Sequence, residues 1–283
     1  MNNPPIYNSD KVKLGDLNEE SGIGHFFAGN PYDISASFYN DYDYDSFWVG
    51  RNFENLADQI AISRLIDKIP PPHRKIIDIG AGTGRISPLY GNKWQKMVLL
   101  DPSLDQLDIA KKRIRNPDEI SFVQGTTESI PLANDSCDAA ICIRTFHYVN
   151  NPQKAIHEIK RILAPNGYLI LEIPNKRHIK VRLRALFSSR LKREISSQNP
   201  RSLALEDKSI LFVNHHPEVI RDILLAEQFE IIDILSVSNF RSSFFKNLIP
   251  LKILLFFERL LQFSLAKIWF GPSIYFLVRK SKT

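Results

Sequence analysis

The 283-residue chain is poor in cysteine and contains no long apolar run. Two cysteines cannot supply a disulfide framework or a structural zinc site, so Cys137 and Cys142 are expected to be packing residues in a reduced compartment. The longest uncharged apolar stretch, 268–278, is far shorter than the ~20 residues that cross a bilayer. The first residues show no apolar run typical of a secretory leader, so none is expected. These absences argue against an integral membrane protein and a small secreted scaffold.

Acidic residues are absent from one segment, and this absence accounts for the charge of the chain. Residues 176–193 hold eight basic residues and no acidic one, in a chain of 37 basic and 31 acidic residues. Without this segment, 29 basic residues face 31 acidic ones. The excess positive charge is therefore a local patch. Basic residues mixed with apolar ones are typical of a surface that meets a membrane or a phosphate-bearing partner.

Apolar residues make up 43% of the chain, enough for a full core. Short apolar runs predict strands at 75–79, 97–100, 120–123, 139–143, 168–173, 229–235 and 274–278. Helical periodicity and capping residues predict helices over 53–69 and 104–114, and helices opened by Asn151–Pro152 and His216–Pro217. This alternation predicts an α/β fold with a mainly parallel sheet covered on both faces. Ligands of such sheets bind at the carboxyl ends of the strands.

Three glycines follow the first expected strand, in the segment IIDIGAGTGRIS at 76–87. Gly80, Gly82 and Gly84 let the backbone turn sharply and approach a ligand closely. A helix expected to begin near Thr83 would point its N-terminus at the same space. The dinucleotide-binding pattern G-x-G-x-x-G requires glycine where this chain has Arg85, so that pattern is not met.

Carboxylates stand at the ends of the first two expected strands. Asp78, just before the glycines, suits a cationic ligand group such as an amine. Asp101, in the segment LLDPS, ends the second strand, where a carboxylate can accept hydrogen bonds from both hydroxyls of a ribose. The structural alternatives are an acceptor for loop amides at Asp78 and a turn-forming residue before Pro102 at Asp101. The occurrence of both acids with the glycines favours a nucleotide site.

These motifs resemble those of the class I S-adenosylmethionine (SAM)-dependent methyltransferases, particularly the small-molecule branch related to quinone and lipid methyltransferases. IDIGAGTG, LLDPS, GTTESIPL and ILAPNGYLILEIPN follow one another over about 75–174, with a weaker echo at 217–235. The resemblance implies a Rossmann-like fold with a central sheet of about seven strands, mostly parallel, its last strand reversed. It also implies SAM as the cofactor and methyl transfer to a small acceptor as the activity.

The resemblance assigns the parts of the cofactor to residues of this chain. The methionine portion falls to Asp78 and the glycine loop, the ribose to Asp101, and the adenine to Pro102, Ser103 and the segment 125–128. The expected cofactor-binding residues are Asp78, Gly80, Ala81, Gly82, Gly84, Asp101, Pro102, Ser103, Thr126, Thr127 and Arg144. The family usually has an acid where this chain has Thr126. This departure affects adenine recognition and leaves open a SAM-binding scaffold without catalysis.

His147 is the candidate catalytic residue. It is the only histidine in the segment where the resemblance places the reacting methyl group, and its ordinary pKa suits proton abstraction. A packing role for this histidine is the alternative. His215 and His216 stand at an expected helix start without further ligands at metal spacing. We therefore expect no metal and assign these two histidines to capping or solvent exposure.

The remaining segments indicate how the chain is organised. Residues 1–30 are expected to be a flexible arm and 31–72 an aromatic and helical lid, with a packed N-terminal helix as the alternative. Residues 73–283 are expected to form the SAM-binding domain, with a basic insertion at 176–214 and an apolar helical insertion at 237–272. The apolar insertion is too hydrophobic for a solvated helix. It is expected to pack on the domain, form a homodimer, or meet lipid, a partner or substrate.

Basic residues near an apolar insertion favour an apolar or lipid-like acceptor at an anionic membrane surface. Nucleic acid is disfavoured as a partner because the basic patch is short and no RNA-binding module is recognisable. The expectation is a cytoplasmic SAM-dependent methyltransferase in peripheral contact with a membrane. An RNA or nucleoside methyltransferase is the alternative.

Overall fold

The computed structural model describes residues 48–114, 120–149, 151–205 and 208–281. The expected arm, 1–30, and the aromatic residues of the expected lid that precede Trp48 lie outside the described residues.

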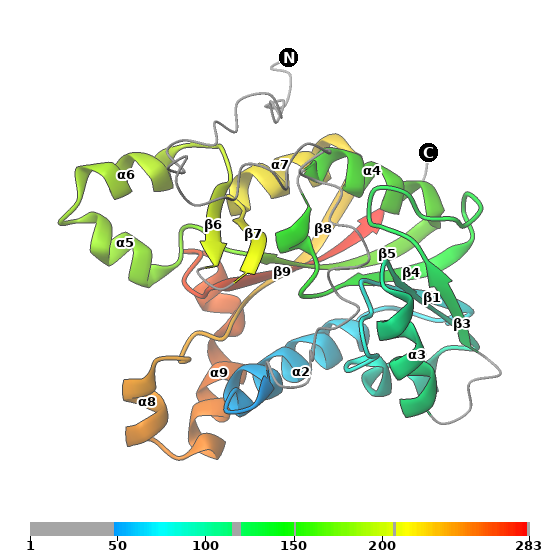
Figure 1. The fold of residues 1–283 in the computed structure, drawn as a ribbon, viewed down its shortest axis with the longest axis horizontal. Helices are drawn as coiled ribbons and strands as arrows, with labels where there is room; N and C mark the ends of the chain where they lie inside the picture. Colours follow the sequence, from blue (N-terminus) through cyan, green and yellow to red (C-terminus); the bar gives the residue numbers. More distant parts are fainter. Residues whose placement is uncertain (1–47, 115–119, 150, 206–207, 282–283) are drawn as a thin grey trace.

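Strands from both halves of the chain form one central sheet, in the order β3-β2-β1-β4-β5-β9-β8 (Figure 1). They are β1 (Lys75–Ile79), β2 (Lys96–Asp101), β3 (Ile120–Gln124), β4 (Cys137–Cys142), β5 (Leu163–Pro174), β8 (Phe229–Val237) and β9 (Ser273–Lys280). Strands β1 to β5 pair in parallel, whereas β9 runs antiparallel to β5 and β8. The expected seven-stranded sheet with a reversed last strand is confirmed. Strand order switches direction between β1 and β4, so a ligand crevice opens at their carboxyl ends.

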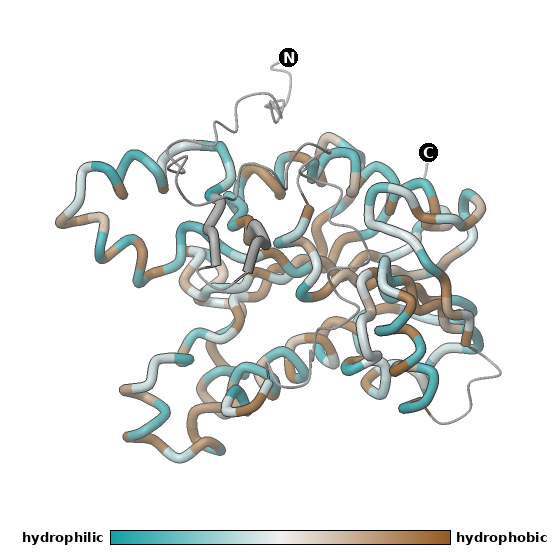
Figure 2. The backbone as a smooth tube through the Cα atoms, viewed as in Figure 1, coloured by the Kyte–Doolittle hydropathy of each residue, from teal (hydrophilic) through white to brown (hydrophobic). Residues whose placement is uncertain are grey.

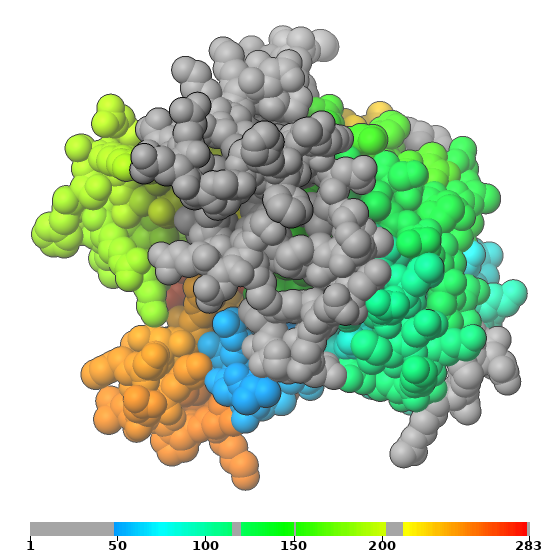
Figure 3. All heavy atoms as spheres, in the orientation of Figure 1, coloured from blue at the N-terminus to red at the C-terminus, as the bar shows by residue number. Residues whose placement is uncertain are grey.

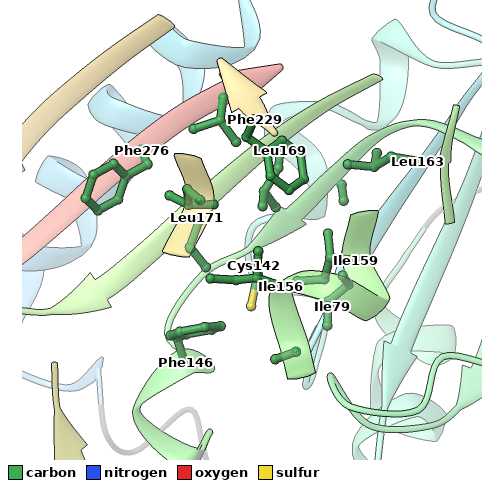
Figure 4. Packing of buried hydrophobic residues seen from close by; sticks show 14 of the residues in the cluster. Ile79, Cys142, Phe146, Ile156, Ile159, Leu163, Leu169, Leu171, Phe229 and Phe276 are labelled. Atoms are coloured by element: carbon green, nitrogen blue, oxygen red, sulfur yellow. The ribbon is translucent and has the colours of Figure 1, made fainter. Parts of the chain in front are cut away.

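Helices cover both faces of the sheet. Helices α4 (Pro152–Ile162) and α7 (Pro217–Ala226) pack on one face, and α2 (Asn52–Ile66), α3 (Leu104–Arg113) and α9 (Leu251–Ala266) lie on the other. Successive side chains of β1 point to opposite faces, so Ile77 belongs to the first core and Ile76 to the second. In the first core, Ile156 of α4 lies beside Cys142 of β4 (Figure 4). Both cysteines are buried free thiols, as expected.

The sequence locates several helix starts correctly. The Ser103 hydroxyl accepts a hydrogen bond from the Gln106 N–H at 3.4 Å at the start of α3. The Asn151 side chain accepts from the Lys154 N–H at 3.0 Å at the start of α4, and Pro152 takes the first helical position. These local bonds satisfy amides that the helix itself leaves without partners.

The helix expected after the glycine loop is absent, and that prediction is wrong. The chain instead forms turns and two short 3₁₀ helices, η5 (Ser87–Leu89) and η6 (Gly91–Lys93). Pro88 lacks the N–H that a continuing α-helix needs, and Gly91 is a poor helix former. No α-helix dipole therefore points from this loop into the crevice.

The described part of the expected lid is α2, which packs on the sheet. Its residues Ala57, Ala61 and Leu65 are fully buried against the second core. Helix α2 is the helix predicted over 53–69, and a lid over 31–72 stays a prediction.

Both expected insertions leave the regular alternation of the fold. Residues 176–214 contain α5 (Ile179–Ala185), α6 (Ser189–Ser196) and an unpredicted hairpin of β6 (Arg201–Leu205) and β7 (Lys208–Asn214). Residues 237–272 contain α8 (Ser243–Leu248) and α9. Lys252 and Arg259 of α9 are exposed, but Gln262, expected on the same side, is buried. Among the described helices, none combines the length and apolarity needed to cross a membrane.

Candidate cofactor pocket and active site

A pocket opens at the carboxyl ends of β1, β2, β3 and β4. Its empty volume is about 1220 Å³ including the solvent at its mouth, enough for a nucleoside-sized ligand. The expected residues that line it are Asp78, Gly80, Ala81, Gly82, Asp101, Pro102, Thr126, Thr127 and Arg144. Gly84, Ser103 and His147 are not among the lining residues. The structure therefore brings together most of the predicted site.

The glycines of the loop have distinct surroundings. Gly80, Gly82 and Gly84 have φ angles of 73°, 52° and 72°, which other residues rarely adopt. A Cβ on Gly80 would lie 2.1 Å from Thr145 Oγ1, and one on Gly84 would lie 3.2 Å from the Ile114 side chain. A Cβ on Gly82 would meet nothing within 4 Å. The open space at Gly82 lets a ligand come directly against the backbone.

Asp101 ends β2 beside this loop. One carboxylate oxygen accepts a hydrogen bond from the Gly82 N–H at 2.8 Å, and the other accepts from the Ser103 N–H at 2.9 Å. Burial raises the pKa of Asp101 to about 6, although these two bonds lower it. Each oxygen keeps a lone pair for a further donor. Ser103 itself is buried as the cap of α3, so it supports Asp101 and the helix from outside the pocket.

Asp78 lies near the end of β1 and is 1% exposed. The Tyr90 hydroxyl donates a hydrogen bond to Asp78 Oδ2. Burial raises the pKa of Asp78 to about 7, and the Tyr90 bond and the charge of Arg85 only partly offset this effect. A positive ligand group beside Asp78 would favour its ionised form. Asp78 is therefore a carboxylate that a cationic ligand would stabilise.

The segment after β3 forms one wall of the pocket. The Thr126 N–H donates to the Ser129 carbonyl at 3.3 Å, which closes a turn. Thr126, Thr127 and Glu128 line the pocket, and Glu128 also lies 3.7 Å from the Lys154 ammonium. Glu128 thus supplies an acid two residues after the position where the resemblance leads one to expect it.

Arg144 has a φ of 58° and belongs to a buried ionic network. Its Nη2 and Nε donate to the two carboxylate oxygens of Asp58 at 2.9 and 3.1 Å, and its backbone N–H donates to Glu172 Oε2 at 3.0 Å. The Tyr275 hydroxyl donates to Asp58 at 2.8 Å. Burial alone would lower the pKa of Arg144. The charges of Asp58 and Glu172 outweigh this effect and raise the pKa well above its ordinary value. This network fixes the loop after β4 against α2.

Sequence reasoning did not identify Asp58, Tyr90, Glu172 or Tyr275. A signal existed for Asp58, because it interrupts the apolar face of α2 between Ala57 and Ala61. No comparable signal marked Tyr90, whose partner Asp78 lies in another element.

His147 is buried next to the pocket. Its ring stacks on the ring of Phe212, with centroids 4.3 Å apart. Burial lowers the pKa of His147 well below its ordinary value, so the ring is neutral at physiological pH. The following residues Tyr148 and Val149 line the pocket. A catalytic role for His147 stays a prediction.

The expectation of solvent exposure for His215 and His216 is wrong, because both side chains are buried. A bridge between Asn175 and His215 draws this segment onto the end of β5, and the His215 Nε2 lies 2.9 Å from the Phe146 carbonyl oxygen. Within the described part of the chain, no group of three or more histidine, cysteine or acidic side chains could hold a metal ion.

The residues present fit SAM. The ionised form of Asp78 would be stabilised by the ligand's amine, and Asp101 keeps lone pairs that can accept from ribose hydroxyls. The open space over Gly82 lets the ligand contact the backbone. These groups surround a single pocket, as a molecule with an ammonium group at one end and an adenosine at the other requires.

Comparisons with known proteins agree with this arrangement. Residues 77–171 match a family model described as a methyltransferase domain. An uncharacterised methyltransferase of Mycobacterium tuberculosis is 34% identical over 101 residues, 36% of this chain and 40% of the relative. Demethylmenaquinone methyltransferase of Renibacterium salmoninarum is 36% identical over 100 residues, 35% of this chain and 41% of the relative. The matched region thus spans less than half the length of these relatives.

Solved structures share the fold. A SAM-dependent methyltransferase from Leishmania major has a TM-score of 0.60 at 14% identity, with 88% of this chain and 82% of that chain covered. One from Mesorhizobium loti has a TM-score of 0.54 at 14% identity, with 80% and 100% covered. SAM is accordingly the cofactor that the family implies for this pocket. Residues 77–171 therefore match a methyltransferase domain, and the fold is shared with SAM-dependent methyltransferases.

Proposed function

We propose that the protein transfers a methyl group from SAM to a small, apolar acceptor presented at an anionic membrane surface. The observation that carries the proposal is the pair of buried carboxylates, Asp78 and Asp101, that flank the open backbone at Gly82 in one pocket. The match to a methyltransferase domain over the same residues supports it.

Each part of the pocket has a role in this proposal. Asp78 holds the amine of the cofactor, Asp101 accepts from the ribose hydroxyls, and the turn of Thr126, Thr127 and Glu128 faces the adenine. When bound, SAM supplies an electrophilic methyl group. The chain then has to orient the acceptor in line and exclude water. The network of Arg144 serves this by holding the loop after β4 rigid.

His147 is proposed as the proton acceptor where the substrate group is a hydroxyl. Its neutral ring can accept a proton, and Tyr148 brings this segment to the pocket wall. The stacking on Phe212 orients the ring. If the acceptor atom were a carbon or an amine nitrogen, the same segment would mainly position the acceptor and would not need to take its proton.

An apolar acceptor is supported by two observations. One relative of the matched domain is named demethylmenaquinone methyltransferase. The chain also exposes large apolar side chains and a basic segment in its two insertions, a combination suited to a lipid surface.

A SAM-binding scaffold without catalysis is the second candidate, favoured by Thr126 in place of the usual acid. A transfer assay separates the two. The full-length protein is incubated with SAM labelled in its methyl group and with extracted membrane lipids, and label in the lipid phase is counted. We expect incorporation that requires lipid and is inhibited by S-adenosylhomocysteine. Tight SAM binding with no incorporation into any lipid or quinone fraction would favour the scaffold instead.

A further inference from the structure

Helix α9 buries two polar side chains against the protein and exposes several large apolar ones. Glu258 and Gln262 are fully buried, and Glu258 accepts from the Asn239 N–H at 3.0 Å. The outward side chains are Ile253, Phe256, Phe257 and Leu260. Their spacing repeats with the period of a helix, so they form one continuous apolar stripe. An amphipathic helix on the surface of a globular protein ordinarily buries such large apolar side chains.

The neighbouring helix extends this stripe. Phe244 and Leu248 of α8 are each 68% exposed. Together, α8 and α9 form a hairpin that exposes large apolar side chains, and hydrophobic residues recur along both helices (Figure 2).

A second hairpin, α5–α6, carries apolar residues at its turn. Phe187 is 92% exposed, and Leu183 and Leu186 are exposed beside it. The two hairpins adjoin, because Arg182 donates a side-chain hydrogen bond to the Ile268 carbonyl at 3.0 Å. They project from the same side of the molecule (Figure 3). We call this surface the apolar face, defined as Leu183, Leu186, Phe187, Phe244, Leu248, Ile253, Phe256, Phe257 and Leu260.

The exposed charges around the apolar face are predominantly positive. The basic residues exposed on its helices and at their ends are Lys180, Arg182, Arg184, Arg190, Lys192, Arg193, Lys252, Arg259 and Lys267. Glu258 is the one acidic residue in the sequence of the segment 237–272, and it is buried. Glu194 of α6 is half-buried and lies 3.3 Å from Arg190 Nε. A negatively charged apolar surface is the complement of this arrangement.

We infer that the apolar face docks the protein onto an anionic lipid bilayer, with Phe187 and the α9 stripe inserted among the headgroups and acyl chains and the basic residues on lipid phosphates. This inference deepens the proposed function by naming the surface that brings the enzyme to an apolar acceptor. A symmetric dimer through the same face would bring the two basic segments together. RNA would leave the exposed Phe and Leu side chains without an apolar partner.

Vesicle sedimentation tests the inference with the full-length protein. Vesicles of phosphatidylcholine with 30% phosphatidylglycerol are compared with vesicles of phosphatidylcholine alone. Phe187→Glu and Phe256→Glu each place a charge on the apolar face without disturbing a buried side chain. Ile109→Glu is the matched control, because Ile109 is 40% exposed on α3 at the opposite end of the molecule (Figure 1). A double variant, Lys180→Glu with Lys252→Glu, tests the charges.

We expect at least tenfold stronger partitioning to the anionic vesicles, with a loss of at least tenfold in each of the three face variants and less than twofold in Ile109→Glu. Calorimetric SAM affinity should stay unchanged in all four, which separates a failure of docking from a failure of the proposed function. Equal partitioning of all variants would overturn the inference. So would a dimer in sedimentation equilibrium that Phe256→Glu dissociates, or RNA binding that exceeds vesicle binding.

Discussion

Replacement of Asp78 by Asn should weaken SAM binding while it stabilises the folded protein. The substitution keeps an oxygen that can accept from the Tyr90 hydroxyl but removes the charge that faces the ligand amine. A hydrogen bond to a charged group contributes about 1.5–3 kcal/mol, so the affinity at pH 7.5 should fall by roughly 10- to 150-fold.

The pH dependence of binding gives the sharper form of this prediction. The pKa of Asp78 is about 7 and that of Asp101 about 6 in the free protein. Between pH 7.5 and pH 6.0, the ionised fraction falls about eightfold at Asp78 and about twofold at Asp101. If both carboxylates must be ionised, SAM affinity falls about 16-fold over this range in the wild type. It falls only about twofold in Asp78→Asn.

The stability effect has the opposite sign. The folded-state pKa of Asp78 is raised above the ordinary value of 3.8, so the folded protein holds this proton more tightly than the unfolded chain does. The free energy of unfolding is therefore lost progressively as the pH rises from about 4 to 7. At pH 7.5, Asp78→Asn should recover up to about 4 kcal/mol, and below pH 4 it should recover none.

Isothermal titration calorimetry over pH 6.0–7.5 and urea unfolding at two pH values measure both effects. Asp105→Asn is the control, since Asp105 lies in the first turn of α3 and does not line the pocket. A variant that loses stability and keeps the wild-type pH profile of SAM binding would refute this reasoning, because Asp78 would then be a structural residue only.

Three other variants test other parts of the site. His147→Ala should lower turnover at least tenfold in the methyl-transfer assay with little change in SAM affinity; unaltered turnover would remove this residue from the mechanism. Arg144→Met leaves the buried Asp58 with only the more distant guanidinium of Arg85, at 3.7 Å, so urea unfolding should show a loss of about 3 kcal/mol, and a loss below 1 kcal/mol would mean that Arg85 or water replaces the pair. Gly80→Ala places a Cβ 2.1 Å from Thr145 Oγ1, so calorimetry should detect no SAM binding, and wild-type affinity would show that the loop can shift.

The parts of the fold that the sequence predicted are those that local patterns determine. The strand Lys75–Ile79 was predicted with its observed bounds, and the helices predicted from 104 and from Asn151–Pro152 start at Leu104 and Pro152. In each case the signal lies within a few residues of the feature.

The parts that the sequence missed depend on contacts between distant segments. Glu172 and Asp58 meet at Arg144 although 114 positions separate them, and no local pattern pairs them. Nothing in the local sequence indicates that His215 and His216 are buried, because their burial depends on the bridge between His215 and the distant Asn175. The inward turn of Glu258 likewise depends on Asn239 in the preceding loop. Family resemblance located the pocket walls, but the partners behind them come from tertiary packing.

A structure of the protein in complex with S-adenosylhomocysteine tests the central claim most directly. The account predicts the amine of the ligand within hydrogen-bond distance of Asp78 and both ribose hydroxyls on Asp101, with the backbone at Gly82 against the ligand. An adenosine bound elsewhere, or a ligand amine that meets neither carboxylate, would contradict it.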